Sequence, residues 1–243
     1  MRQYDAPAAV INSPAAKFRN LVKTGSYMDR THIPGILAMA VIVLASNILV
    51  QFVVGDWLPW LGGFLTWGAF TYPLAFLVTD LMNRFYGPRA ARQVVIVGFI
   101  VGIFCSLVGT QIVGEFGPLV TFRVALGSGL AFLTAQLIDV QIFDRLRTGK
   151  WWSAPLASTI IGSSVDTAIF FTIAFAAFLN GMDPEHLPLW AQDAVPLLGF
   201  GPETPLWVSL AVADWMVKLT LALLALVPFK MIVQRRIRRN TMA

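Results

Sequence analysis

The chain has 243 residues, of which 57% are hydrophobic and 13% are charged, and its formal net charge is +5 at pH 7. A soluble protein of this length exposes far more charge, so the composition excludes an ordinary soluble domain. The mean hydropathy of +0.70 indicates a helical integral membrane protein instead.

Six apolar segments follow one another, each about as long as the roughly 20 residues that a helix needs to cross a bilayer. They cover residues 33–55, 57–79, 93–114, 116–138, 151–182 and 204–229. The first three contain no charge, the fourth contains Arg123, the fifth Asp166, and the sixth Asp214 and Lys218. We therefore predict an all-α membrane protein in which residues 1–243 form a single domain of six transmembrane helices.

Basic and acidic residues occupy different linkers. Apart from Arg123 and Lys218, every Lys and Arg lies in the N-terminal lead (1–32), in the turns at 84–92 and 145–150, or in the tail (230–243). The other linkers contain only acidic charges. Basic loops stay in the cytoplasm during insertion, so we expect both termini there. This sorting, with attraction to anionic lipid headgroups, explains the basic net charge without a nucleic-acid partner.

The longest outer linker, residues 180–205, is rich in proline and contains Trp190 and Leu198. A short interfacial helix and a plain linker fit this segment equally well. A lid over a cavity is a third interpretation.

Motifs for catalysis are missing from the sequence. The run 148–150, Thr-Gly-Lys, lacks the upstream glycine of a phosphate-binding loop. Cys105 is the single cysteine, which excludes an intramolecular disulfide and a cysteine-based metal cluster. His32 and His186 lie outside the apolar interiors, so a serine nucleophile there has no histidine base. We expect neither enzymatic activity nor a cofactor.

The charges inside the apolar segments need partners. A charged side chain at mid-bilayer costs about 2.5 to 3.5 kcal/mol on insertion scales, so each should pair or line a polar cavity. Asp214 and Lys218 stand four residues apart and can pair on one helix face, which disfavours an aspartyl protease built from Asp166 and Asp214. Asp166 and Arg123 are then left to face the interior from neighbouring helices.

Uncharged polar groups reach a similar depth. Asn47 and Gln51 lie one turn apart on the first predicted helix, and Trp67 lies on the second. Together with Asp166 they offer amides, an acid and an aromatic face, which suit a planar, nitrogen-rich solute. The opposing interpretation is that buried ion pairs only lock the bundle together.

Two stripes of small residues recur at four-residue spacing. Gly98, Gly102 and Ser106 form one, and Ser158 and Gly162 form the other, just before Asp166. Such stripes allow helices to approach closely or to dimerise. We expect packing within one bundle, with a homo-oligomer as the alternative.

Several longer motifs are familiar. They lie at residues 46–51, 66–73, 79–81, 85–87, 136–140, 143–147 and 151–159, with Asp166, Asp214 and Lys218. Together they make residues 33–230 resemble the bacterial queuosine precursor transporters of the vitamin uptake transporter family. The resemblance implies a multi-pass protein of the bacterial inner membrane that imports 7-deazaguanines, chiefly 7-cyano-7-deazaguanine, for tRNA queuosine salvage.

A more distant similarity leaves an alternative. The vitamin-binding components of energy-coupling-factor transporters also use about six helices, so this chain could be a substrate-binding subunit for a vitamin or deazapurine that needs an ATPase partner. The Ala-x-x-x-Ala docking pattern typical of such components is missing from the first helix. That absence favours a carrier that works alone.

The implied substrate suggests roles for the polar residues. An acid can accept from the N–H edge of a guanine-like ring, amides or Arg can meet its carbonyl, and Trp can stack on its face. The predicted substrate-binding residues are Asn47, Gln51, Trp67, Arg123, Gln136 and Asp166. The predicted gate or ion-pair residues are Asp80, Asp139, Asp214 and Lys218. For Asp80 and Asp139, capping a helix or pairing with Arg84, Arg92 or Arg145 is the alternative.

Overall fold

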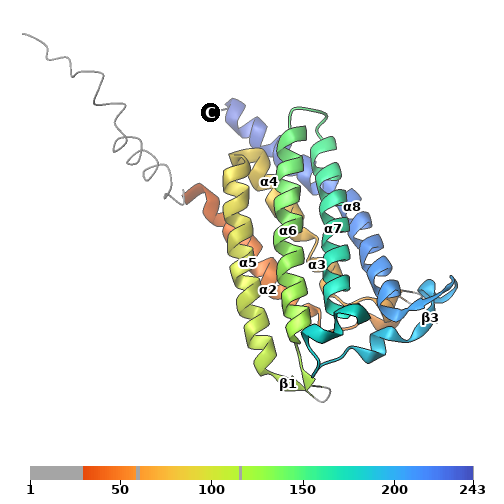
Figure 1. Cartoon of the computed structure of the whole chain (residues 1–243). Helices are drawn as coiled ribbons and strands as arrows, with labels where there is room; N and C mark the ends of the chain where they lie inside the picture. Colours follow the sequence, from red (N-terminus) through yellow and green to blue (C-terminus); the bar gives the residue numbers. More distant parts are fainter. Residues whose placement is uncertain (1–29, 59–60, 115–116, 243) are drawn as a thin grey trace, which may run out of the picture. The chain divides into compact units, whose positions relative to one another are not determined.

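The computed structural model describes residues 30–58, 61–114 and 117–242, and these belong to two compact units, 1–33 and 34–243. Of the first unit it describes the short helix η2 (Arg30–His32) and Ile33, so most of the predicted N-terminal lead lies outside the described residues. The second unit contains the membrane domain and is described below (Figure 1).

Within the described ranges, five helices are long and apolar enough to cross a membrane. They are α2 (Ile33–Leu49), α5 (Pro88–Gln111), α6 (Phe122–Leu146), α7 (Ser153–Phe175) and α8 (Leu206–Met242). Along the bundle α5 packs on α6, α6 on α7, and α7 on α8 (Figure 1). Their outer faces are strongly apolar, with Phe104 67% and Leu224 60% exposed, as expected for side chains that contact lipid. The prediction of an all-α membrane protein is confirmed for these five helices.

The second predicted span differs from expectation. Instead of one helix over 57–79, the chain forms η3 (Gly55–Trp57), η4 (Gly62–Phe64), α3 (Gly68–Thr71) and α4 (Leu74–Tyr86). Residues 53 and 66 pair as an antiparallel bridge, and Gly62 lies so close to the Gly55 carbonyl that no Cβ fits there. Pro73 then separates α3 from α4, because proline has no N–H to continue a helix. This segment is thus a broken helix whose regular part runs seven residues past the predicted end, to Tyr86.

Local signals explain the turn that follows α4. Gly87 adopts φ 86°, and its N–H bonds to the carbonyl of Asn83, which is the usual glycine termination of a helix. Pro88 starts α5 at the first helical position, where the lack of an N–H costs nothing. The Arg84 guanidinium donates to the carbonyl of Arg147 at 2.7 Å and so connects this turn to the α6–α7 turn.

The packing role predicted for small residues is confirmed. A Cβ on Gly98 would lie 2.7 Å from Met39 and 2.9 Å from Phe132, so this glycine lets α5 approach both α2 and α6. The hydrophobic core around it includes Met39, Val43, Val94, Val95, Phe132 and Val140. Gly162 lets α7 approach α4 and α6 in the same way, because a Cβ on it would lie 2.8 Å from Phe76 and 3.3 Å from the Ala135 carbonyl.

The outer linker is not a plain connection, because it contains several short helical turns and a small hairpin; an interfacial position for any of these turns stays a prediction. The linker contains η5 (Ala177–Met182), η6 (Leu189–Gln192), β3 (Ala194–Pro196), η7 (Leu197–Gly199) and β4 (Glu203–Pro205). Strands β3 and β4 pair antiparallel, and Leu198 between them packs with Val54, Leu65, Ala69 and Ala213. A second small hairpin, β1 (Val113–Gly114) with β2 (Gly117–Pro118), joins α5 to α6.

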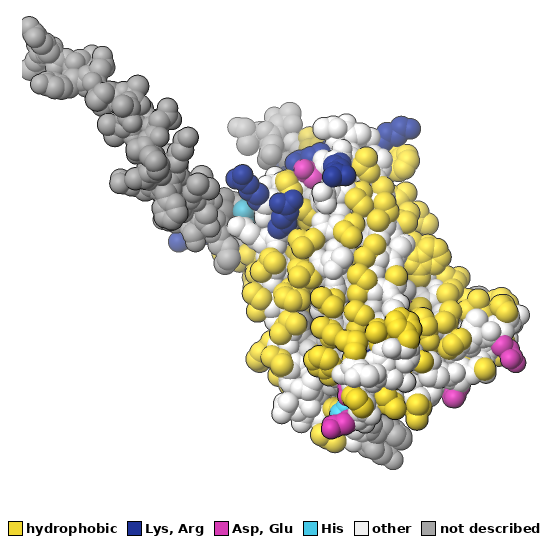
Figure 2. All heavy atoms as spheres, viewed as in Figure 1, with side chains coloured by type: hydrophobic (Ala, Val, Ile, Leu, Met, Phe, Trp, Pro, Cys, Tyr) yellow, Lys and Arg dark blue, Asp and Glu magenta, His cyan; other side chains and the backbone are white. Residues whose placement is uncertain are grey.

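The two ends of the bundle differ in charge. We call the end with the α4–α5 and α6–α7 turns the basic end; its residues are Arg84, Arg89, Arg92, Arg145, Arg147 and Lys150. The opposite, acidic end includes the linker with Asp183, Glu185, Asp193 and Glu203. Figure 2 shows Lys and Arg gathered at the first end, Asp and Glu mainly at the second, and a broad apolar surface between them.

Candidate functional site

A buried network of charges lies where α7 and α8 meet the end of α3. The Lys218 ammonium, from α8, contacts the Asp166 carboxylate of α7 at 2.6 Å and also the Asp214 carboxylate one turn away on α8. Lys218 is 4% exposed and Asp166 3%. The predicted Asp214–Lys218 pair is therefore confirmed. Asp166 was expected to remain apart from this pair, but it is the second partner of Lys218.

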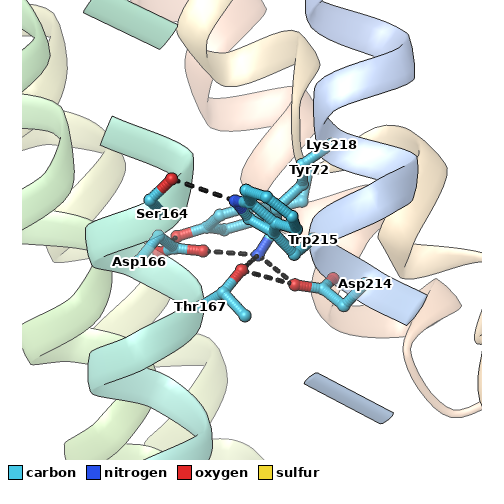
Figure 3. A network of polar contacts seen from close by, with 7 residues as sticks. All are labelled: Tyr72, Ser164, Asp166, Thr167, Asp214, Trp215 and Lys218. Carbon is cyan, nitrogen blue, oxygen red and sulfur yellow. Dashed lines mark hydrogen bonds and ion pairs between the residues drawn. The ribbon is translucent and has the colours of Figure 1, made fainter. Parts of the chain in front are cut away.

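Two hydroxyl groups complete this network (Figure 3). The Thr167 hydroxyl donates to Asp214 at 2.9 Å and lies 3.2 Å from the Lys218 ammonium. The Tyr72 hydroxyl donates to the other oxygen of Asp166 at 3.3 Å, and its ring centroid lies 5.6 Å from the ammonium. We call these five residues the outer network, because they lie nearer the acidic end of α7 and α8.

The outer network has more acid than base. Two carboxylates share one ammonium, and no further Lys or Arg among the described residues forms a salt bridge with either of them. In a low-dielectric interior such an excess of negative charge is costly unless hydrogen-bond donors meet it. The network is thus suited to a solute that presents N–H groups.

A groove opens beside this network, between α7 and α8. Its volume is about 360 Å³, which is within the range of small-molecule sites. Aromatic and other apolar side chains dominate its lining, and Thr167 belongs to both the groove and the outer network. Trp215 crosses one wall and donates from its indole N–H to Ser164 at 2.9 Å (Figure 3). The groove is lined by Ser164, Thr167, Ala168, Phe171, Thr172, Trp207, Val208, Ala211, Val212 and Trp215.

A second polar cluster lies closer to the basic end. Asp80 of α4 accepts from the Ser158 hydroxyl at 3.3 Å and from the Thr159 hydroxyl at 3.4 Å, both on α7. Asp139 of α6 is its charged neighbour. Ser158 and Asp166 are eight residues apart on α7, so about 12 Å separates this inner cluster from the outer network.

The inner cluster extends along the contact of α4 with α6. The Thr79 hydroxyl donates to the Gln136 side chain at 2.7 Å, and the Asn83 amide donates to the Val140 carbonyl at 2.9 Å. Thr79, Asn83, Gln136 and Asp139 are all fully buried.

Asp80 and Asp139 do not have the partners that the alternative interpretation assigned to them. Neither acid forms a salt bridge within the described part of the chain, and both lie in helix interiors rather than at caps. Arg84, one of the predicted partners, bonds instead to a backbone carbonyl. The two acids therefore form a buried carboxyl pair.

Two facing stripes connect the clusters. Tyr72, Phe76 and Asp80 recur every four residues from the end of α3 into α4, and Ser158, Gly162 and Asp166 do so on α7. Tyr72 bonds to Asp166, Phe76 packs on Gly162, and Asp80 bonds to Ser158. The Phe76 ring thus separates the outer network from the inner cluster.

Arg123 has a different environment from the one predicted. Its guanidinium donates to the carbonyls of Ile173 at 2.9 Å and Ala176 at 2.7 Å, and to the Asn180 side chain at 2.8 Å. These acceptors lie at the end of α7 and in the segment that follows it. The contacts cap α7, because the last carbonyls of a helix have no partner inside it.

The remaining predicted binding residues do not join the outer network. Asn47 donates to the Val43 carbonyl of its own helix, Gln51 is exposed, and Trp67 packs against Trp57 with ring centroids 6.3 Å apart. Of the six predicted substrate-binding residues, only Asp166 belongs to the network. Whether the others contact substrate stays a prediction.

Three residues at the site, Tyr72, Thr167 and Trp215, were not among the predicted site residues. A signal for Tyr72 was present, since it lies in the motif 66–73 and four residues before Phe76. Thr167 follows Asp166 directly. Trp215 had no such signal, because its contact with Ser164 depends on how α7 and α8 pack.

Comparison with known proteins places these residues in a family context. Residues 66–233 match a family model described as "Putative vitamin uptake transporter", a range that includes the outer network and the inner cluster. The chain is 32% identical over 198 residues to the "Queuosine precursor transporter" of Escherichia coli K12, covering 77% of this chain and 79% of that protein. It is 35% identical over 175 residues to the "Probable queuosine precursor transporter" of Haemophilus influenzae, covering 67% and 66%. No solved structure matches.

Proposed function

The chain belongs to the vitamin uptake transporter family, and we propose that it imports queuosine precursors of the 7-deazaguanine type across the bacterial inner membrane. The names of its relatives support this substrate class, and the long apolar helices support a multi-pass transporter. In this proposal both termini lie in the cytoplasm, the basic end faces the cytoplasm, and no covalent chemistry takes place.

The observation that supports this function most is the excess of carboxylate in the outer network. A 7-deazaguanine ring has an edge of N–H donors next to a carbonyl. That edge can replace the Lys218 ammonium at the Asp166 carboxylate. The displaced ammonium keeps its ion pair with Asp214 and can donate a hydrogen bond to the ring carbonyl. The exchange conserves hydrogen bonds, so the substrate can enter a buried site at little electrostatic cost.

The groove between α7 and α8 supplies the apolar part of the proposed site. A planar ring that enters beside Trp215 and Thr167 meets aromatic faces before it reaches Asp166. The Tyr72 ring centroid lies 5.6 Å from the Lys218 ammonium, so Tyr72 can stack on the ring once the ammonium moves. We propose that Tyr72, Asp166, Thr167, Asp214, Trp215 and Lys218 form the substrate site.

Uptake by the purified protein alone, in liposomes supplied with radiolabelled 7-cyano-7-deazaguanine, tests this function. We expect uptake by the wild type and its loss in Asp166→Asn, which keeps the side-chain size but removes the acceptor charge. Asp144→Asn is the matched control, because Asp144 is a half-exposed acid near the basic end that pairs with Arg147.

Two outcomes would contradict the proposal. Transport by Asp166→Asn at the wild-type rate would remove the outer network from the substrate site. Substrate binding by the wild-type protein without uptake would instead identify the alternative, a substrate-binding subunit that needs an ATPase partner.

A further inference from the structure

The inner cluster contains two buried acids that face each other without a base. Asp80 is 2% exposed and Asp139 is fully buried. Asp139 is the charged neighbour of Asp80, and no salt bridge to Asp80 forms within the described residues. Two carboxylates this deep in a bundle repel each other and lose their hydration, so one of them needs a proton or another cation.

Hydrogen bonding distinguishes the two acids. Asp80 accepts from two hydroxyl groups, as a charged carboxylate does. Asp139 has no donor for either oxygen among the residues the structure describes, although Ser158 and Asp80 are its polar neighbours. A proton on Asp139 provides the missing bond, since a protonated carboxyl can donate to the neighbouring carboxylate.

Other groups near the pair are also incompletely bonded. The Asn83 side-chain oxygen and the Gln136 side-chain nitrogen have no partner in the described part of the chain, and both residues are fully buried. Asn83 follows Asp80 by one turn of α4, and Gln136 precedes Asp139 by one turn of α6. Buried polar groups are rarely left unpaired, so these atoms indicate a site that binds something small.

A small hollow reaches Asp80 from the side of α8. Asp80, Thr159, Phe76 and Phe229 are among its lining residues, and its volume of about 10 Å³ is close to that of one water molecule. Phe229 lies in the half of α8 nearer the basic end. The hollow therefore offers room for a single water molecule beside Asp80, to which this carboxyl can pass a proton.

We propose that the Asp80–Asp139 pair binds the proton that drives substrate import. This inference rests on the proposed function and adds the coupling ion to it. In each cycle an O–H bond forms on one carboxyl while the site faces outward. That bond breaks to water at the cytoplasmic side, so one proton enters with each substrate and no other co-reactant is needed.

Other charged groups on the packed helices are engaged or exposed. Arg84 of α4 bonds to the Arg147 carbonyl, and Arg89 and Arg92 of α5 are exposed. On α6, Asp144 pairs with Arg147. On α7 and α8, the charged side chains Asp166, Asp214 and Lys218 belong to the outer network. The Lys230 ammonium, also on α8, lies 4.9 Å from the Trp151 ring centroid. Helix α2 contributes no ionisable side chain to the bundle.

The facing stripes explain how proton and substrate can be coupled. A hydrogen bond between Asp139 and Asp80 requires the shared proton, and Asp80 holds α4 against α7 because it accepts from Ser158. Loss of the proton leaves two repelling carboxylates and so favours separation of the helices near the basic end. Tyr72, two turns away on the same stripe, binds Asp166 in the outer network, so movement of α4 reaches the substrate site.

The test uses the full chain in liposomes with an imposed pH gradient. We expect wild-type protein to accumulate labelled 7-cyano-7-deazaguanine when the outside is acidic, with proton entry reported by a trapped pH dye. Asp139→Asn should lose this accumulation yet still exchange labelled for unlabelled substrate at equal pH. Asp144→Asn should keep both activities.

Each result separates the two proposals. A wild type that exchanges no substrate contradicts the proposed function itself. Exchange without any response to the pH gradient, accumulation driven by Na⁺ instead, or gradient-driven accumulation by Asp139→Asn leaves the function standing and contradicts the proton site. If Asp139→Asn does not fold, Ser158→Ala serves instead: it removes a donor to the Asp80 carboxylate, so the pH dependence of uptake should shift to higher pH.

Discussion

Lys218 is the residue on which the outer network depends most. Among the residues that the structure describes, it is the sole base that contacts both Asp166 and Asp214, and it is almost fully enclosed. Its removal leaves two acids in the bundle without a counter-charge. Breaking a buried ion pair from one side is far more harmful than replacing the whole pair, because the remaining charge is not solvated.

Lys218→Met should therefore lower the free energy of unfolding by roughly 3 to 5 kcal/mol, the range typical of buried pairs broken from one side. Thermal unfolding in detergent measures the change. The double variant Lys218→Met/Asp166→Asn should recover part of the loss. Lys230→Met on the same helix is the control, since Lys230 is exposed. Equal melting temperatures for Lys218→Met and wild type would show that the network does not stabilise the fold.

Arg123 allows two roles to be separated by one substitution. The sequence predicted a substrate contact, whereas the structure shows its guanidinium bonded to the end of α7. Lys keeps the charge at this position but cannot reach three acceptors in different directions.

Arg123→Lys should destabilise the protein by about 1 to 3 kcal/mol, the usual cost of leaving buried groups unpaired. Substrate affinity, measured by binding of labelled 7-cyano-7-deazaguanine to the purified variant, should change little. The opposite result, normal thermal stability with a clear loss of affinity, would support the role that the sequence predicted.

Among the elements, α4 and α7 determine the spacing between the two polar clusters. They touch closely at Gly162, where a side chain would meet Phe76 and the Ala135 carbonyl. A backbone carbonyl in α6 cannot move aside as a flexible side chain can. The contact at Gly162 therefore sets the distance at which Asp80 meets Ser158 and Tyr72 meets Asp166.

Gly162→Ala should destabilise the bundle by about 1 to 3 kcal/mol, the range for overpacked cores. Phe76→Leu in the same chain should restore part of this loss by removing the nearest ring atom. Gly102→Ala on α5 is the control, because a Cβ there lies an ordinary 3.6 Å from Val43. If Gly162→Ala and Gly102→Ala have the same melting temperature, α4 and α7 are not in close contact at Gly162.

Sequence patterns predicted elements better than the contacts between them. Five long helices follow from long apolar runs with at most two charges in each, and the Asp214–Lys218 pair follows from spacing on one helix. The place of Asp166 beside Lys218 could not be predicted, since it depends on how α7 and α8 are rotated against each other. The broken second segment was missed because its composition is as apolar as a continuous helix, and its fold depends on Gly55 packing against Gly62.

On the scale of the whole molecule, charge is distributed along the helix axes. The basic turns 84–92 and 145–150 lie at one end of the bundle, and the acidic linker around β3 lies at the other (Figure 2). The C-terminal part of α8 ends near the basic turns (Figure 1). Because basic loops are retained in the cytoplasm during insertion, this distribution predicts the orientation of the domain.

Single-cysteine labelling tests that orientation. In a Cys105→Ala background, Glu203→Cys should react with a membrane-impermeant maleimide in intact cells. Lys150→Cys and Arg239→Cys should react only after the membrane is permeabilised. All three positions are exposed side chains, so a lack of reaction reports the membrane side rather than burial.

The three positions together also test individual crossings. Only α7 and the outer linker separate Lys150 from Glu203, so opposite reactivity at these sites requires that α7 spans the membrane. In the same way, only α8 separates Glu203 from Arg239. Reaction of Lys150→Cys in intact cells would contradict a cytoplasmic basic end. It would also reverse the direction in which the Asp80–Asp139 pair releases its proton, so orientation and coupling are tested on the same molecule.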